Sequence, residues 1–462
     1  MQFTLTISNL IHMPLSLALV LHILLAVEII FIELYKRRRG LLFFDFLTLA
    51  NIFYLLSYSL TPVFYLWFSD TNILLDTEYV FQIATLTFFA YQMLLLGWAA
   101  TGSLRFKANK PLPTPILEYK WYRLSVTFLF ITFLMLILLV LDKGGISGYL
   151  SGALARYSFE DSETGSFAFL SRLTSISPFL SAIFFYFLIK KPCGISHRAI
   201  KVLFAISIIL SLLQVFGGAS RGGMIRLLVL LGLVYVLVNR KIKLLHTLLI
   251  SLFAILFITY GKQTFYAVSN YVAYGESFSE SFNYLDEVRS NAIDESDNVV
   301  FREFAHPYRS MDAVLRYEQS GYTYTYFSDF IWSPFRIIPY RYTSILFERP
   351  EPINNLNTEL ITGIPDSGGI PPGLIASFYY SIGILGIAIG SFFYGLIGRR
   401  INIWSDRMMK TSKIYSVPFA FFAYYYGFFI ANGDPNVYIY YLIMPVLFLF
   451  ALRFIKHKRK LS

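Results

Sequence analysis

Long apolar runs separated by short polar stretches dominate the pattern of this chain. A membrane-spanning helix needs about 20 mainly apolar residues, and eleven segments meet that requirement. They lie at 11–34, 41–68, 79–101, 124–141, 167–189, 199–217, 222–238, 244–261, 371–397, 414–431 and 437–455. The pattern therefore predicts an all-α polytopic integral membrane protein with about eleven transmembrane helices. The first segment lacks a basic front end and a small-residue cleavage site, which favours an uncleaved anchor.

The basic residues are concentrated in every second connection between these segments. The connections 35–40, 102–123, 190–198 with Lys201, 239–243, 398–413 and the tail after 452 hold 26 of the 39 Lys and Arg residues. The other face receives the remaining 13, together with 23 of the 28 acids. Because cytoplasmic loops carry the excess of Lys and Arg, we expect the N-terminus outside and the C-terminus in the cytoplasm.

Composition supports a membrane protein and excludes several other classes. Only 15% of the 462 residues are charged and 56% are hydrophobic, whereas soluble domains carry about 25% charge. The net charge of +11 is then explained by basic residues in cytoplasmic loops that face the membrane lipids. No nucleic-acid partner is expected. The single cysteine, Cys193, excludes an intramolecular disulfide and a cysteine-cluster metal site.

The predicted segments divide the chain into three parts. Residues 1–261 hold spans one to eight, 262–370 form a large external segment, and 371–462 hold spans nine to eleven with a basic tail. The external segment contains 15 acids and 8 bases, and it is too rich in Tyr, Phe and Ile for a disordered linker. Its aromatic stretch at 321–342 is interrupted by prolines, which suits an interfacial or re-entrant segment.

Two arginines stand out in the turn between spans six and seven, Gly217-Gly-Ala-Ser-Arg-Gly-Gly-Met-Ile-Arg226. Basic residues are rare on this external face, and an arginine offers a fixed fork of donors for phosphate oxygens. Arg221 and Arg226 are therefore candidate phosphate ligands, with lipid-headgroup contact as the plainer alternative. Arg156, in the external connection 142–166, could join them, or it could belong to an ordinary Gly/Ser connector.

The large external segment holds the candidates for proton transfer. His306 could act as a general base near neutral pH, although a lone histidine is more often a packing residue, and Arg302 and Arg309 flank it. Asp366, in the Gly/Pro-rich run 363–373, is either a catalytic carboxylate or part of a helix entry. No second His or Cys lies at metal-ligand spacing from His306, so we expect no metal.

Three acids fall inside the predicted spans. Glu28 is the deepest, and an intramembrane carboxylate is a functional hypothesis by default. Glu33 and Asp45 lie beside the basic run 36–39, and we expect them to pair with it. The spans hold too few charges for a continuous ion pathway, which disfavours a proton-coupled transporter.

Three features together resemble the Wzy-type O-antigen and capsule repeat-unit polymerases. They are the Gly218-Ala-Ser-Arg-Gly-Gly turn, the large external segment, and the Gly/Pro-rich re-entry 368–386. The spacing from Arg221 to Gly232 also matches an Arg-ten-residues-Gly pattern of some members. The resemblance covers most of the chain as architecture but only these short pieces as sequence.

That resemblance implies a GT-C-like fold and a metal-independent glycosyltransferase without cofactor. The family transfers a growing glycan from undecaprenyl pyrophosphate to the next lipid-linked repeat unit, at the periplasmic face of the bacterial inner membrane. A chain-length regulator and a flippase are candidate partners. We expect pyrophosphate binding by Arg156, Arg221 and Arg226, with Arg221 also stabilising the leaving group. We expect acceptor binding or proton transfer by Arg302, His306, Arg309 and Asp366.

Two other functions remain open at this point. An O-antigen ligase uses the same lipid-linked donor with a different acceptor and shares the plan of spans and one large loop. A glycan flippase or transporter belongs to a different class. The lack of an internal repeat and the single large external segment disfavour the transporter.

Overall fold

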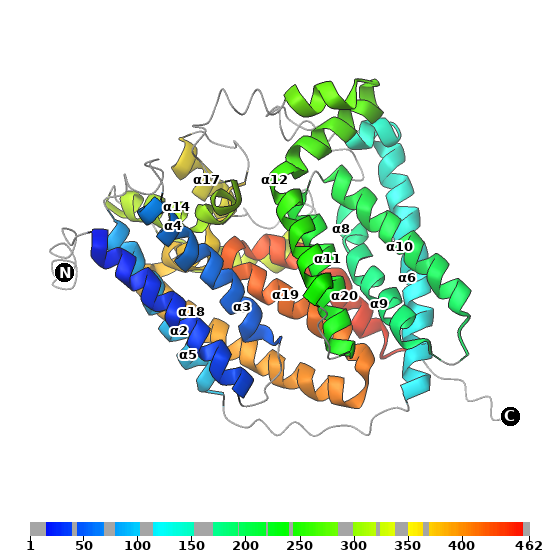
Figure 1. Cartoon of the computed structure of the whole chain (residues 1–462), viewed down its shortest axis with the longest axis horizontal. Coiled ribbons are helices and arrows are strands. Elements are labelled where there is room, and N and C mark those ends of the chain that lie inside the picture. Colours follow the sequence, from blue (N-terminus) through cyan, green and yellow to red (C-terminus); the bar gives the residue numbers. More distant parts are fainter. Residues whose placement is uncertain are drawn as a thin grey trace. The chain divides into compact units, whose positions relative to one another are not determined.

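Helices dominate the architecture of the chain. The computed structural model describes residues 15–38, 44–68, 79–101, 114–151, 170–192, 194–218, 220–239, 244–284, 299–319, 324–337, 350–363 and 369–455. No strand occurs within these ranges, and Figure 1 shows helices joined by connecting segments. The all-α prediction is therefore confirmed for the described residues.

Nine helices in the described ranges are long and apolar enough to cross a membrane. They are Leu15–Arg38, Phe46–Trp67, Val80–Ala99, Pro115–Asp142, Leu170–Lys190, His197–Gly217, Arg221–Asn239, Gly373–Thr411 and Lys413–Asn432, and each overlaps a predicted segment. The eighth predicted segment lies within helix α12 (Leu244–Tyr274). The eleventh lies in α20 (Pro435–Ala451), an apolar helix of 17 residues. The chain is thus a polytopic α-helical protein with nine candidate membrane-spanning helices in its described part.

The chain forms two compact units, which we call the first and second units. The first comprises Met1–Arg105, Asp294–Trp404 and Ala423–Ile439, and the second comprises Phe106–Ile293, Ser405–Phe422 and Tyr440–Ser462. The first contains α2 (Leu15–Arg38), α3 (Phe46–Leu55), η1 (Leu56–Leu60), α4 (Thr61–Phe68), α5 (Val80–Ala99), α14 (Val299–Gln319), α15 (Ser328–Trp332), η2 (Ser333–Ile337) and α17 (Ile353–Thr362). The second contains α6 (Thr114–Asp142), α8 (Leu170–Thr174), α9 (Ser177–Lys190), α10 (His197–Gly217), α11 (Arg221–Asn239) and α12. Three helices have residues in both, namely α18 (Gly373–Thr411), α19 (Ser416–Asn432) and α20.

A proline changes the hydrogen bonding within the second span, where α3 passes through the π-helical turn η1 into α4. Pro62 has no N–H, so the carbonyl of Tyr58 loses its usual helical donor four residues ahead. The Nδ1 atom of His22 in α2 donates to that carbonyl at 2.9 Å, and the Ser59 hydroxyl donates to the His22 carbonyl at 2.7 Å. These two hydrogen bonds join α2 to the π-helical turn.

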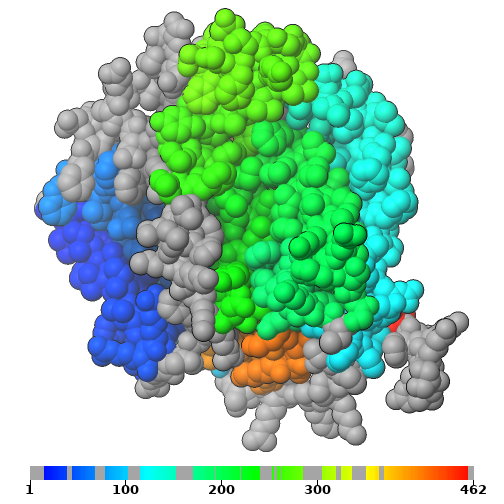
Figure 2. All heavy atoms as spheres, turned by 45° about the vertical axis from the view of Figure 1, so that its right-hand side comes forward, coloured from blue at the N-terminus to red at the C-terminus, as the bar shows by residue number. Residues whose placement is uncertain are grey.

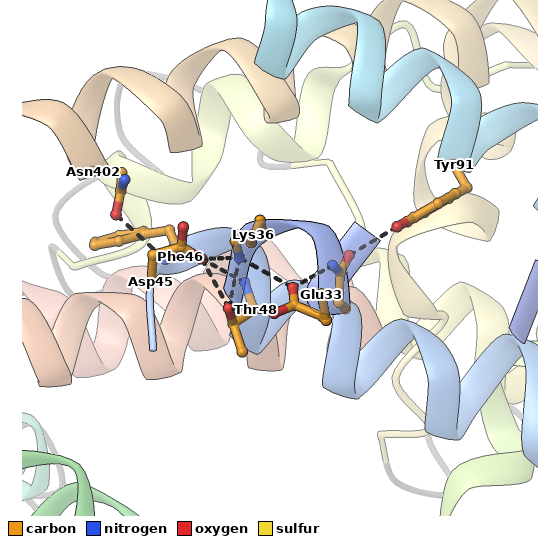
Figure 3. Close-up of polar contacts among 8 residues, drawn as sticks. Glu33, Lys36, Asp45, Phe46, Thr48, Tyr91 and Asn402 are labelled. Atoms are coloured by element: carbon orange, nitrogen blue, oxygen red, sulfur yellow. Dashed lines mark hydrogen bonds and ion pairs between the residues drawn. The ribbon is translucent and has the colours of Figure 1, made fainter. Parts of the chain in front are cut away.

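One lysine organises a polar network at the end of α2 (Figure 3). The ammonium of Lys36 donates to Glu33 at 3.0 Å, to Asp45 at 2.7 Å and to the Thr48 hydroxyl at 2.7 Å. Asp45 also caps α3 by accepting from the Thr48 N–H at 2.8 Å, which satisfies a backbone donor at the start of that helix. The predicted pairing of Glu33 and Asp45 with the basic run is confirmed at Lys36.

The same network reaches two further helices. The side-chain amide of Asn51 donates to Glu33 at 2.7 Å, and its carbonyl accepts from the Tyr91 hydroxyl of α5 at 3.1 Å. The backbone N–H of Phe46 points to the side-chain oxygen of Asn402 in α18 at 3.4 Å. Helices α2, α3, α5 and α18 therefore share one set of hydrogen bonds (Figure 3).

An aromatic cluster fills the interior of the second unit. Trp121 of α6 is fully buried and its ring contacts those of Phe179, Tyr415 and Phe448 at centroid distances of 6.5, 6.0 and 5.2 Å. The outer side chains of α6, α10 and α12 are visible in Figure 2. Exposed apolar residues on these helices are Phe130, Ile137, Leu141, Val202, Ile206, Ile209, Leu252, Phe253 and Leu256. An apolar outer surface of this kind is what lipid tails require.

We expect Lys36→Met to destabilise the protein strongly. It leaves the buried carboxylate of Asp45 and the partly buried carboxylate of Glu33 without their cation, and breaking a buried ion pair in this way costs about 3–5 kcal/mol. Thermal unfolding of the purified protein in detergent should show a large fall in stability. The matched control is Lys410→Met, because Lys410 pairs with Asp406 but is 74% exposed, and exposed pairs contribute at most about 1 kcal/mol. Equal losses in the two variants would contradict this account.

Candidate functional site

Helices α14 and α17, both within residues 262–370, pack against the start of α18 through buried polar groups. The amide nitrogen of Asn357 in α17 donates to the Ser310 hydroxyl at 3.0 Å and to the Ile370 carbonyl at 2.9 Å. Its amide oxygen accepts from the Tyr380 hydroxyl of α18 at 3.0 Å. Asn357, Ser310 and Tyr380 are all fully buried, so α14 and α17 are anchored to a candidate membrane helix by satisfied polar contacts.

Close backbone contact explains the glycine that begins α18. Gly373 has a φ of 74°, and a Cβ there would lie 2.5 Å from the Tyr58 hydroxyl and 2.6 Å from Pro307. A Cβ on Gly433 would lie 2.2 Å from the Gly373 carbonyl, and the Ser377 hydroxyl donates to the Gly433 carbonyl at 2.7 Å. Only glycine permits this approach at both positions.

His306 lies at this packed region. Its Nε2 donates to the carbonyl of Ala431, at the end of α19, at 3.0 Å. In the neutral ring that hydrogen bond leaves Nδ1 as the basic nitrogen, so any proton acceptance by His306 would use Nδ1. Arg309 lies one turn later on α14 and is exposed. The catalytic role of His306 stays a prediction.

Two further predicted residues cannot be placed in this region. Asp366 and Arg156 lie outside the described residues, and so does the side chain of Arg302, although its backbone belongs to α14. The non-helical character predicted for 363–373 is confirmed where it is described, because α17 ends at Thr362, Gly363 has a φ of 72°, and α18 begins only at Gly373.

A break inside α18 is the second irregular feature. Ile382 and Gly383 have non-helical backbone angles within this long apolar helix. The carbonyls of Tyr380 and Ser381, just before the break, accept from the backbone N–H groups of Thr325 and Tyr326, both at 2.9 Å. Part of the predicted re-entrant stretch 321–342 thus forms a turn whose N–H groups supply hydrogen bonds to the carbonyls at the break in α18.

A carboxylate lies beside this turn. The two oxygens of Glu318 accept from the hydroxyls of Tyr324, at 2.8 Å, and Tyr379. Partial burial, and next the hydrogen bond to Glu318, raise the pKa of Tyr324 to about 12, so its hydroxyl stays protonated and donates. Nothing in the linear pattern of the sequence links Glu318 to Tyr379, so Glu318 was not among the predicted site residues.

Two buried carboxylates meet at the connection between α19 and α20. The side-chain nitrogen of Asn436 contacts both oxygens of Asp329 at 3.2 Å and one oxygen of Asp434 at 2.9 Å. Asp329 and Asp434 are 2% and 1% exposed. The polar run Asn432-Gly-Asp-Pro-Asn436 was the available signal for this pair, and it was missed. Among the described residues, no group of three or more His, Cys, Asp or Glu side chains could hold a metal ion.

In the second unit, the predicted glycine turn joins α10 to α11 as expected. A Cβ on Gly217 would overlap the ring of Tyr149, at 2.1 Å, so glycine is required there. Ser220 caps α11 by accepting from the Gly223 N–H at 3.0 Å. Arg221 begins α11, and its side chain lies against Gly261 of α12, where a Cβ would come within 2.8 Å of it.

Arg226 lies one and a half turns further along α11 and contacts α20. Its guanidinium lies over the ring of Tyr441, 3.8 Å from the centroid, and the residue is only 8% exposed. Arg226 and Arg172 of α8 both lie in the neighbourhood of the hydroxyl of the adjacent Tyr440. We call Arg172, Arg226, Tyr440 and Tyr441 the arginine–tyrosine cluster.

The predicted site residues thus fall into two groups. Arg221 and Arg226 belong to the second unit, and His306 and Arg309 belong to the first.

Comparison with known protein families, with curated proteins and with solved structures finds no match to this chain. Its function is therefore argued from the chemistry of its own residues.

Proposed function

We propose that this protein polymerises undecaprenyl-pyrophosphate-linked oligosaccharide repeat units into a surface polysaccharide. It would be a metal-independent glycosyltransferase that transfers the growing glycan from its lipid pyrophosphate to the next lipid-linked unit. The observation that carries the proposal is the gathering of arginines with tyrosines in the second unit, beside the capped start of a long apolar helix. The resemblance to Wzy-type polymerases in the turn at Gly218–Gly223 supports the same assignment.

Donor binding is the step that the arginine–tyrosine cluster suits. Stacking on Tyr441 engages the face of the Arg226 guanidinium, whereas phosphate oxygens are bound by N–H groups at its edge. Burial strengthens the attraction between this cation and an anionic ligand. The helix dipole already attracts anionic ligands to the N-terminus of α11, and Arg221 adds a positive charge at the same place. Arg156 is the further ligand that the sequence suggests.

Glycosyl transfer then needs little further chemistry. An acceptor hydroxyl attacks the anomeric carbon, the bond from that carbon to the pyrophosphate oxygen breaks, and the departing phosphate takes the negative charge that arginines stabilise. A base accepts the hydroxyl proton. His306 through Nδ1 and Asp366 are the candidate bases, while Arg302 and Arg309 would bind acceptor hydroxyls.

The membrane arrangement completes the proposal. We infer eleven spans, with a GT-C-like plan, the N-terminus outside and the C-terminus in the cytoplasm, in the inner membrane of a bacterium. The asymmetry of basic residues supports this orientation. The active face would then be periplasmic, with a chain-length regulator and a flippase as candidate partners.

An O-antigen ligase is the second candidate, because the arginine–tyrosine cluster would suit the same lipid-linked donor. A flippase or transporter of glycans is a third, from a different class. The small number of charges within the predicted spans disfavours a transporter that would need a continuous charged path across the membrane.

We expect Arg226→Ala to reduce polymerisation by about 100-fold or more, as removal of one donor to a developing oxyanion does. Arg226→Lys should be intermediate, because it keeps the charge but loses the fork of donors and much of the stacking. The measurement is chain growth by purified protein supplied with lipid-linked repeat units. Arg400→Ala is the matched control, since Arg400 is an exposed arginine of α18. Normal activity of Arg226→Ala at equal protein abundance would refute the role of this arginine.

Deletion of the gene should separate the three functions. A polymerase mutant leaves single repeat units on the lipid A core, and a ligase mutant leaves none. A flippase mutant accumulates lipid-linked units on the cytoplasmic side of the membrane. We expect the first pattern on a polysaccharide gel, and an unchanged long-chain ladder would exclude polymerase function.

A further inference from the structure

The turn that covers the break in α18 is held in an unusual backbone conformation. Tyr326 and Phe327 have φ angles of 49° and 58°, in the left-handed region that residues with side chains rarely occupy. Two such residues in succession persist only where the surroundings hold them, and they concentrate at functional sites. We therefore expect this turn to do more than connect two helices.

Contacts on both sides hold the turn in place. The N–H groups of Thr325 and Tyr326 donate to the carbonyls before the break in α18, at 2.9 Å each. Phe327 packs against Phe330 and Phe378, with ring centroids 5.8 and 6.4 Å apart. The turn is thus a rigid element of the first unit, attached to a candidate membrane helix.

This rigid turn orients a carboxylate at the surface. Tyr324, at its start, and Tyr379 of α18 donate to opposite oxygens of Glu318 at the end of α14. Glu318 is nevertheless exposed, whereas Tyr379 is 2% exposed. An ionised carboxylate offers about four acceptor sites, so two hydrogen bonds fix its orientation and leave acceptor capacity facing outward. Gly383 permits the arrangement, because a Cβ there would lie 2.9 Å from the Tyr324 hydroxyl.

An aromatic surface lies next to the same carboxylate. The ring of Tyr326 is 66% exposed, and it meets the Tyr324 ring edge-on at a centroid distance of 6.5 Å. A pre-oriented hydrogen-bond acceptor beside an exposed aromatic ring is the combination that binds a sugar, whose hydroxyls donate and whose apolar ring face packs on the aromatic face. The same pair would offer little to an anionic ligand.

We propose that Glu318, Tyr324 and Tyr326 form a saccharide-binding site, in which Glu318 accepts hydrogen bonds from sugar hydroxyls and Tyr326 packs against the sugar ring. Tyr379 acts as a positioning residue that holds Glu318. This inference rests on the proposed function, since it assigns to these residues the glycan part of the acceptor repeat unit. None of these residues is assigned a part in the glycosyl transfer step.

The test measures binding of a glycan without its lipid. The full-length protein in lipid nanodiscs is titrated with the repeat-unit oligosaccharide released by partial hydrolysis of the host's own surface polysaccharide, and binding is followed by saturation-transfer NMR. We expect saturable binding to the wild-type protein. Glu318→Gln should weaken it about tenfold or more, because a hydrogen bond to a charged acceptor is lost. Tyr379→Phe should weaken it about twofold to tenfold through misorientation of Glu318.

The matched control is Glu359→Gln on α17, which packs against α14. In the described part of the chain its carboxylate receives no hydrogen bond from a tyrosine, unlike Glu318. Thermal unfolding of each variant checks that the fold is retained. Unchanged affinity in Glu318→Gln, or no saturable binding to the wild-type protein, would overturn the site. Because the readout needs no polymerisation, a loss of binding in Glu318→Gln supports the site even if gene deletion were to exclude polymerase function.

Discussion

The hydrogen bonding of the backbone inside the membrane is the constraint on which this structure depends. Lipid offers no partner for a peptide N–H or carbonyl, so each must be satisfied within the protein. Regular helices meet that requirement alone, and most of the chain is helical for this reason. Among the described residues, two of the places where an apolar helix departs from it are Pro62 and Ile382–Gly383. In both places groups from another part of the first unit supply the missing hydrogen bonds: the His22 ring at the first and the backbone of Thr325 and Tyr326 at the second.

The His22 ring and the turn at Thr325 and Tyr326 supply these hydrogen bonds only if they are held in place. The contacts that hold them also bring polar side chains together. His22 is fully buried against Tyr308, and the turn at Tyr326 is pinned by aromatic packing and backbone bonds. Glu318 owes its orientation to the second of these elements. The turn between α10 and α11 is similar. Ser220 accepts a hydrogen bond from a backbone N–H at the start of α11, the helix that carries Arg221 and Arg226. Irregular backbone and the residues able to do chemistry therefore occur side by side.

Much of the fold could be predicted from the sequence. All eleven apolar runs overlap helices in the described part of the chain, and nine of the overlapping regions are candidate membrane spans. The charges beside 36–39 correctly indicated the pairing at Lys36. The boundaries were less accurate: α18 continues to Thr411, well into the predicted cytoplasmic connection, because a polar helix can extend beyond the apolar part of a span. The candidate site was predicted in part. The Gly217–Arg226 turn was identified, whereas Glu318 and the buried pair Asp329 and Asp434 were not, since each looks like an ordinary acid in an external segment.

The sequence by itself determined which segments are helical and apolar, because helix formation and lipid exposure depend on residues that are close together along the chain. Only the tertiary structure decided which polar groups meet. His22 and Tyr58 are 36 residues apart, Glu318 and Tyr379 are 61 apart, and Asp329 and Asn436 are 107 apart. Such pairs form because packing brings their helices into contact, and no local pattern encodes that contact. The contacts between polar groups therefore depend on pairs that are distant in the sequence, whereas the apolar helices depend on local patterns.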